Sequence, residues 1–173
     1  MRIGKRTSYY PVLNIPEGRD GKFAIEHVIK APGDRVMLAT MRNVLFGQKA
    51  QAQNLVFEHP TRWHRLLEDG WVWMTDYPIE QRQADELVSG VSGTVLVGGL
   101  GLGYFTVALA RMKAVKRIVV VEKSAAVGRL VWRHLGGKVL EKATLVTEDL
   151  FKFLKRNTDA FDFGLYDIWQ GDG

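Results

Sequence analysis

The chain has 173 residues, contains no cysteine and carries a formal net charge of +5 at pH 7. Its hydrophobic share of 46% and charged share of 25% are those of an ordinary globular protein rather than of a disordered or fibrous chain. The absence of cysteine excludes disulfide bonds and thiolate metal sites and fits a reducing compartment, so we expect a cytoplasmic protein. Residues 1–6 lack the apolar core of a signal peptide, and glycines interrupt the longest apolar stretch, residues 94–110, so we expect no membrane span.

The first part of the chain is expected to form a small antiparallel β region. Prolines and glycines in residues 1–20 indicate an extended arm with one short strand. Apolar and polar residues then alternate, and the Ala-Pro-Gly-Asp sequence at 31–34 is typical of a turn between two strands. The strands expected after the arm are residues 22–30, 35–41, 43–48, 54–58 and 71–74.

Two helices are expected before the central motif. Thr61 is a good N-cap for a short helix over residues 62–68, which the Asp-Gly pair at 69–70 would end. Pro78 is tolerated in a first helical turn, and a helix over 79–88 should follow it.

Three histidines lie in this half, at His27, His59 and His64. No pair of them has a metal-ligand spacing together with a third ligand, so we expect no metal site. The ordinary interpretation is a surface histidine or a hydrogen-bonded one.

The centre of the chain has a strand–turn–helix–strand pattern. Residues 94–97 are a short apolar run, typical of a strand buried on both faces, and glycines follow at once. Residues 104–112 have helical spacing, and 118–121 are a second apolar run that ends at Glu122. The helix N-terminus can attract a carboxylate or a phosphate, and an acid at the end of the next parallel strand can accept both hydroxyls of a ribose. The unit therefore predicts a nucleoside site.

The spacing of the glycines indicates which nucleoside. A dinucleotide fingerprint needs G-x-G-x-x-G, whereas here the glycines stand at Gly99, Gly101 and Gly103. With Glu122 behind it, this pattern resembles the class I S-adenosylmethionine-dependent methyltransferases, and the run VLVGGLGLG resembles their spermidine-synthase-like branch. The resemblance implies that the chain binds S-adenosylmethionine, with the three glycines near its methionine part and Glu122 on its ribose.

A third strand, residues 143–147, should follow a helix that begins after the N-cap Ser124 and runs to about residue 135. The sequence D-L-F-K-F-L from Asp149 is similar to the family motif D-x-x-x-F-L. The resemblance implies that Asp149, with Leu150 beside it, contacts the adenine. Asp149 is also a suitable N-cap for the helix that follows it, and the two roles are compatible.

The last part of the chain resembles the fourth strand of the family. Residues 161–167 read F-D-F-G-L-Y-D, and the resemblance places Asp167 at the strand's carboxyl end, facing the sulfonium. Asp167 is therefore the candidate catalytic residue, as a base or as a group that orients the acceptor. Spermidine synthases have an acid where this chain has Gln170 and a glutamine near the position of Trp73, so aminopropyl transfer is disfavoured.

The fold predicted is α/β. It consists of an antiparallel β region over residues 1–75 and a shortened Rossmann-like domain over 76–173, with a parallel sheet of order 3-2-1-4 flanked by helices. A complete family sheet has further strands, so we expect a reduced or truncated family member that covers its open sheet edge by forming a homo-oligomer.

The leading function is that of a spermidine-synthase-like methyltransferase with an unknown acceptor. One alternative is an oligomeric module that binds the cofactor without catalysis. The other is a basic nucleic-acid-associated protein, because Lys and Arg are dense over residues 111–138. No aromatic platform for base stacking is interleaved with these charges, which favours an ordinary solvated surface.

Overall fold

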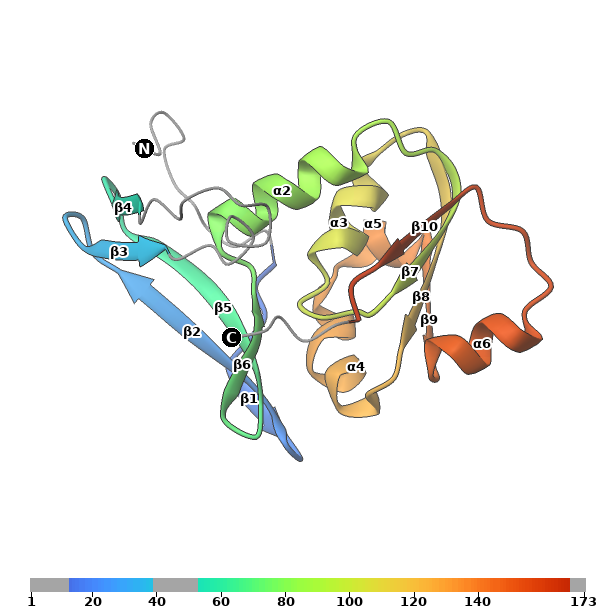
Figure 1. Ribbon diagram of the computed structural model, residues 1–173, viewed down its shortest axis with the longest axis horizontal. Helices are drawn as coiled ribbons and strands as arrows, with labels where there is room; N and C mark the ends of the chain where they lie inside the picture. The colour runs from blue at the N-terminus through green and yellow to red at the C-terminus, as the bar shows by residue number, and fades with distance from the viewer. Residues whose placement is uncertain (1–12, 39–52, 169–173) are drawn as a thin grey trace, which may run out of the picture. The chain divides into compact units, whose positions relative to one another are not determined.

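The computed structural model describes residues 13–38 and 53–168 (Figure 1). In the described part, residues 28–38 and 53–62 belong to one compact unit, and residues 13–27 and 63–168 belong to another. The second unit contains the whole parallel sheet and much of an antiparallel sheet. The division of the chain into domains after residue 75 remains a prediction.

Antiparallel strands dominate the first part of the chain, as expected. Four of them form a sheet in the order β1-β2-β5-β6, and β3 pairs with β4. The expected strand at residues 43–48 lies outside the described residues. The bounds are β1 (Gly18–Asp20), β2 (Phe23–Lys30), β3 (Arg35–Leu38), β4 (Gln53–Val56), β5 (Thr61–Glu68) and β6 (Trp71–Thr75).

The helix expected over residues 62–68 is wrong, because these residues form strand β5. Strand β5 pairs antiparallel with β6, and the two-residue loop between them has positive φ angles, 50° at Asp69 and 84° at Gly70. An Asp-Gly pair with this geometry is the turn that a tight hairpin requires. The pair therefore closes a hairpin rather than ending a helix, and strand pairing overrides the local capping signal of Thr61.

The parallel sheet has the predicted order. Strands β7 (Gly93–Gly98), β8 (Val115–Glu122), β9 (Ala143–Thr147) and β10 (Phe163–Tyr166) are arranged as β10-β7-β8-β9. Each neighbouring pair is parallel. This is the order 3-2-1-4 read from the other edge, so the α/β fold class with a Rossmann-like sheet is confirmed.

Two helices begin at the predicted caps. Ser124 Oγ accepts the Val127 N–H at 3.3 Å, and Asp149 Oδ1 accepts the Phe151 N–H at 3.0 Å. The single helix expected to residue 135 is instead α4 followed by a short 3₁₀ turn. The bounds are α2 (Pro78–Val88), α3 (Tyr104–Arg111), α4 (Ala125–Val131), η1 (Trp132–His134), α5 (Gly137–Leu140) and α6 (Leu150–Arg156).

The central strands β7 and β8 of the parallel sheet are buried on both faces. Side chains alternate between the faces, so Val95 and Val97 join a cluster with residues of α3 and α4, whereas Leu96 joins Leu150 and Phe153 of α6 on the other face. Figure 1 shows α6 apart from the other helices, beyond β9. Within the described residues, no helix has the length and apolar character needed to cross a membrane.

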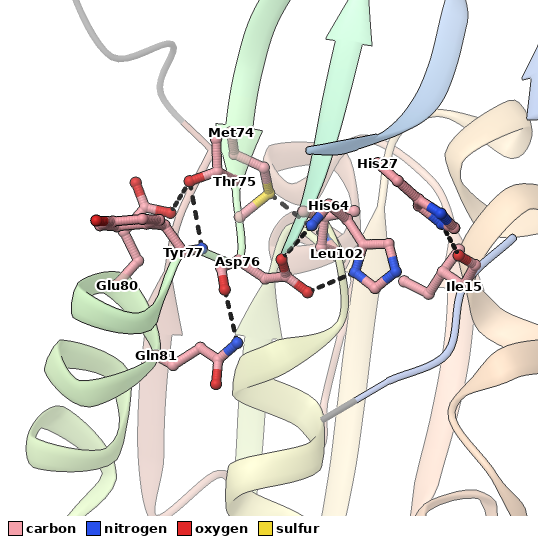
Figure 2. A network of polar contacts seen from close by, with 10 residues as sticks. All are labelled: Ile15, His27, His64, Met74, Thr75, Asp76, Tyr77, Glu80, Gln81 and Leu102. Atoms are coloured by element: carbon pink, nitrogen blue, oxygen red, sulfur yellow. Dashed lines mark hydrogen bonds and ion pairs between the residues drawn. The ribbon is translucent and has the colours of Figure 1, made fainter. Parts of the chain in front are cut away.

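A buried polar pair joins the hairpin to helix α2 (Figure 2). The fully buried His64 donates its backbone N–H to Asp76 Oδ1 at 2.6 Å, and its Nδ1 lies 2.6 Å from Asp76 Oδ2. The Asp76 carbonyl accepts the Gln81 side-chain N–H at 2.6 Å, and the ring of His27 packs edge-on against His64 with centroids 4.9 Å apart. His64 is thus a structural residue, and no cluster of three metal-binding side chains occurs in the described parts of the chain.

Removing the Asp76 carboxylate should therefore destabilise the protein strongly. Asp76→Ala leaves the backbone N–H and the ring of the buried His64 without their acceptor, which should lower the free energy of unfolding by about 2–4 kcal/mol. Urea unfolding measures the loss. Asp159→Ala is the control, because Asp159 pairs with Arg117 at the exposed surface and should contribute at most about 1 kcal/mol. Equal losses in the two variants would contradict a structural role for the buried pair.

Candidate functional site

A cavity of about 520 Å³ lies at the carboxyl edge of the parallel sheet, where open α/β sheets bind their ligands. This volume is within the range of small-molecule sites. The ends of the four parallel strands supply one of its walls, and six of the residues predicted from the sequence line it: Gly99, Gly101, Glu122, Asp149, Leu150 and Asp167.

The glycine turn follows β7, and its backbone requires glycine at two of the lining positions. Gly99 and Gly101 have φ angles of 93° and 51°. A Cβ atom on Gly99 would lie 2.4 Å from the backbone oxygen of Asp167, so glycine here lets the end of β10 come close to the turn. Gly103 is not among the residues that line the cavity. A Cβ atom there would lie 2.5 Å from a methyl group of Leu135, so this glycine serves the packing of α3.

Glu122 fixes the turn to the end of β8. Its Oε2 accepts the Leu100 N–H at 2.8 Å, and its Oε1 accepts the Ser124 N–H at 2.6 Å. An ionised carboxylate has about four acceptor positions, so both oxygens retain capacity for a further donor. Glu122 therefore positions the turn and can also bind hydroxyl groups in the cavity.

Met74 holds the turn from the other side (Figure 2). The Leu102 N–H donates to Met74 Sδ at 3.3 Å, and a Cβ atom on Gly101 would lie 2.2 Å from that sulfur. Gly101 thus lacks a side chain at the point where β6 packs against the turn. No sequence pattern indicates this contact, because a methionine in a strand is ordinarily a core residue.

Four N–H groups of the turn are used within the protein. Gly99 donates to the Val121 carbonyl and Gly103 to the Leu100 carbonyl, each at 2.8 Å. The Leu100 and Leu102 N–H groups are occupied by Glu122 and Met74. A phosphate at this turn would have to displace these acceptors, so the arrangement is unsuited to the pyrophosphate of a dinucleotide.

Asp149 caps helix α6 and keeps one oxygen less engaged. Oδ1 accepts the Phe151 and Lys152 N–H groups at 3.0 and 3.2 Å, whereas Oδ2 makes a longer ion pair of 3.8 Å with Lys123. The capping role is confirmed, and Oδ2 remains suitable for a donor such as an exocyclic amino group. Apolar side chains line the cavity beside it, namely Val121, Leu150 and Ile168.

Two acids occur near the end of β10. The backbone N–H of Asp167 donates to the Gly98 carbonyl at 2.9 Å, and desolvation raises the pKa of the Asp167 carboxyl although much of the residue is accessible. Desolvation also raises the pKa of the Glu80 carboxyl although the residue is exposed, and the charges of Asp76 and Asp167 add to this effect. A hydrogen bond from the Thr75 hydroxyl to Glu80 acts in the opposite direction. The sequence analysis did not single out Glu80, whose pKa responds to the charge of Asp167.

The basic residues of the 111–138 stretch are exposed, and several are paired with acids. Arg129 binds Asp20 through two nitrogens at 2.6 and 3.1 Å, and Arg117 binds Asp159 at 3.1 Å. These pairs favour the interpretation as an ordinary solvated surface.

No protein-family model matches the chain, and no curated protein matches it. It is similar to a candidate O-methyltransferase from Klebsiella pneumoniae (22% identity, TM-score 0.46, over 52% of this chain and 43% of that one). It is similar to a spermidine synthase in complex with the transition-state analogue AdoDATO (16% identity, TM-score 0.46, over 61% of this chain and 40% of that one). It is also similar to a candidate S-adenosylmethionine-dependent methyltransferase from Streptococcus mutans (28% identity, TM-score 0.44, over 68% of this chain and 32% of that one). The chain spans less than half the length of each of these proteins. The fold class therefore rests on the strand order and connections described above.

The contact between Met74 and Gly101 can be tested by a double-mutant cycle. Gly101→Ala should cost about 2 kcal/mol of unfolding free energy, because its Cβ atom meets the sulfur and its φ of 51° disfavours alanine. In the Met74→Ala background the same change should cost about 1 kcal/mol less, since the sulfur is gone. Strictly additive losses in urea unfolding would show that the two residues do not touch.

The raised pKa of Asp167 predicts a particular dependence of stability on pH. A carboxyl whose pKa is higher in the folded than in the unfolded protein stabilises the fold while it is protonated and destabilises it when it ionises. The free energy of unfolding should therefore fall as the pH rises from the ordinary pKa of 3.8 through the raised one. Asp167→Asn should therefore be more stable than the wild type at about pH 7 and no more stable at about pH 3. Glu148→Gln is the control of opposite sign, because Arg156 lowers the pKa of Glu148. A gain for Asp167→Asn that does not change with pH would contradict the shift.

Proposed function

We propose that the chain binds S-adenosylmethionine in this cavity and acts as a methyltransferase of the spermidine-synthase-like type. The observation that carries the proposal is the internal use of the turn's N–H groups by Glu122 and Met74. Dinucleotide-binding folds place a pyrophosphate on the equivalent N–H groups. A turn whose Leu100 and Leu102 N–H groups are already paired within the protein, followed by an acid at the end of the next strand, suits a nucleoside that carries no phosphate.

The lining residues fit the parts of this cofactor in order along the sheet edge. Glu122, whose oxygens retain acceptor capacity, would bind the ribose hydroxyls. Asp149 Oδ2 and the backbone of Leu150 would bind the adenine edge, with Val121 and Ile168 against its faces. Gly99 and Gly101 would lie along the methionine part. When bound, the cofactor supplies a methyl group already activated by its sulfonium.

Asp167 is the residue we assign to the acceptor. It lines the same cavity, and its raised pKa brings it nearer to the range in which a carboxylate can take a proton from an acceptor group. The protein otherwise has mainly to align the acceptor with the methyl group. A module that binds the cofactor without catalysis would have the same cavity, and loss of turnover in Asp167→Asn would distinguish the enzyme from it.

Calorimetric titration with S-adenosylmethionine and S-adenosylhomocysteine tests the cofactor assignment. We expect micromolar binding of both and much weaker binding of NAD. Glu122→Gln keeps an oxygen for the Leu100 N–H but loses the charge and one acceptor, so it should weaken binding by about tenfold or more.

The matched control is Glu148→Gln, because Glu148 pairs with Arg156 and does not line the cavity. Its affinity should equal that of the wild type. If the wild type binds neither S-adenosyl ligand, or binds NAD more tightly, the assignment is wrong.

A further inference from the structure

The cavity has a second wall that the cofactor assignment does not use. The antiparallel sheet forms it, through side chains of β2, β5 and β6 and of the residue before β2: Lys22, Phe23, Leu66, Glu68, Trp73 and Met74. These residues belong to the same compact unit as the parallel sheet. The wall is therefore part of one site with the glycine turn and can contact whatever is bound beside the cofactor.

The charges on this wall neutralise each other. Lys22 Nζ and Glu68 Oε1 form an ion pair, and this hydrogen bond is the main reason why the pKa of Lys22 is raised. A ligand with a positive or negative charge would find no free counter-charge on this wall and would lose hydration on entering the cavity. The wall thus disfavours a polyamine, a carboxylate or a phosphate.

The rest of the wall is apolar and partly aromatic. Leu66 is only 1% exposed, and Phe23, Trp73 and Met74 are half-buried and pack against the hydrophobic core. Trp73 differs in this from Trp71 on the same strand, which is 76% exposed and does not line the cavity. Aromatic side chains bind other rings favourably in offset or edge-to-face contact.

We propose that this wall is a binding subsite for an uncharged aromatic ring, with Trp73 as its main contact. The proposal rests on the proposed function in one respect only, namely that this ring belongs to the methyl acceptor. The contact of the ring with Trp73 is a property of this chain's own residues and can be measured without turnover.

The experiment is a titration of the protein with p-cresol as the probe, in the presence and absence of S-adenosylhomocysteine. Saturation-transfer NMR and calorimetry measure the binding. Tyramine has the same ring with an ammonium group, and putrescine is an aliphatic dication. We expect the affinity for p-cresol to be at least about tenfold higher than the affinity for either amine. Trp73→Leu should weaken p-cresol binding by about tenfold, whereas Trp73→Phe should retain most of it.

Trp71→Leu is the matched control, since it removes an indole from the same strand outside the cavity and should leave p-cresol binding unchanged. The proposal is overturned if an amine binds more tightly than p-cresol, or if Trp73→Leu binds p-cresol as the wild type does. If Trp73→Leu fails to fold, the order of affinities of the wild type for the three probes still tests the proposal.

The two proposals can fail separately. Binding of S-adenosylhomocysteine without binding of p-cresol would overturn the ring subsite and leave the cofactor assignment standing. Binding of p-cresol that depends on Trp73, without binding of S-adenosylhomocysteine, would overturn the cofactor assignment and leave the ring subsite standing. Absence of both would overturn both.

Discussion

The carboxylate of Glu122 is the constraint on which the site depends. It accepts one N–H from the glycine turn after β7 and one from the residue that caps α4, so a single side chain fixes the loops that follow two neighbouring strands. The same bond removes the Leu100 N–H from contact with ligands. This is why the turn, although it precedes a helix as a phosphate-binding turn does, suits a ligand without phosphate. What remains available is the acceptor capacity of a charged group at the strand end, and that matches a ribose.

Met74 connects this turn to the antiparallel sheet. Its sulfur accepts the Leu102 N–H, and the next residues along the chain, Thr75 and Asp76, form hydrogen bonds to Glu80 of α2 and to His64 of β5. The end of β6 is therefore held by a buried pair on one side and by the glycine turn on the other. As a result, the apolar side chains of β2, β5 and β6 become a wall of the cofactor cavity, and substitutions in the hairpin should influence ligands bound at the parallel sheet.

Much of the parallel half could be predicted from the sequence, because its signals are local. Strand β9 has the predicted bounds and helix α6 begins after the predicted N-cap Asp149, since a β-branched run and an N-cap aspartate are local signals. Carboxyl ends of adjacent parallel strands meet, so Glu122, Asp149 and Asp167 were expected in one place and are found there. Strand β5 could not be predicted in this way, because its state is decided by pairing with β6 and a threonine N-cap signal was misleading. The short helix α5 was not predicted, because it is only four residues long and begins with Gly137, a residue of low helix propensity. Met74 was not predicted either, since it reaches the site from strand β6, whose placement no local pattern encodes.

The most direct test of the account is a crystal structure of the protein with S-adenosylhomocysteine. We predict that the ribose hydroxyls lie within hydrogen-bond distance of the Glu122 carboxylate, while that carboxylate still accepts the Leu100 N–H and Met74 still accepts the Leu102 N–H. The ligand would then bind a turn that is already formed. A ligand bound elsewhere, or one that takes the Leu100 and Leu102 N–H groups for itself, would contradict the account, because the turn would then act as an anion-binding site after all.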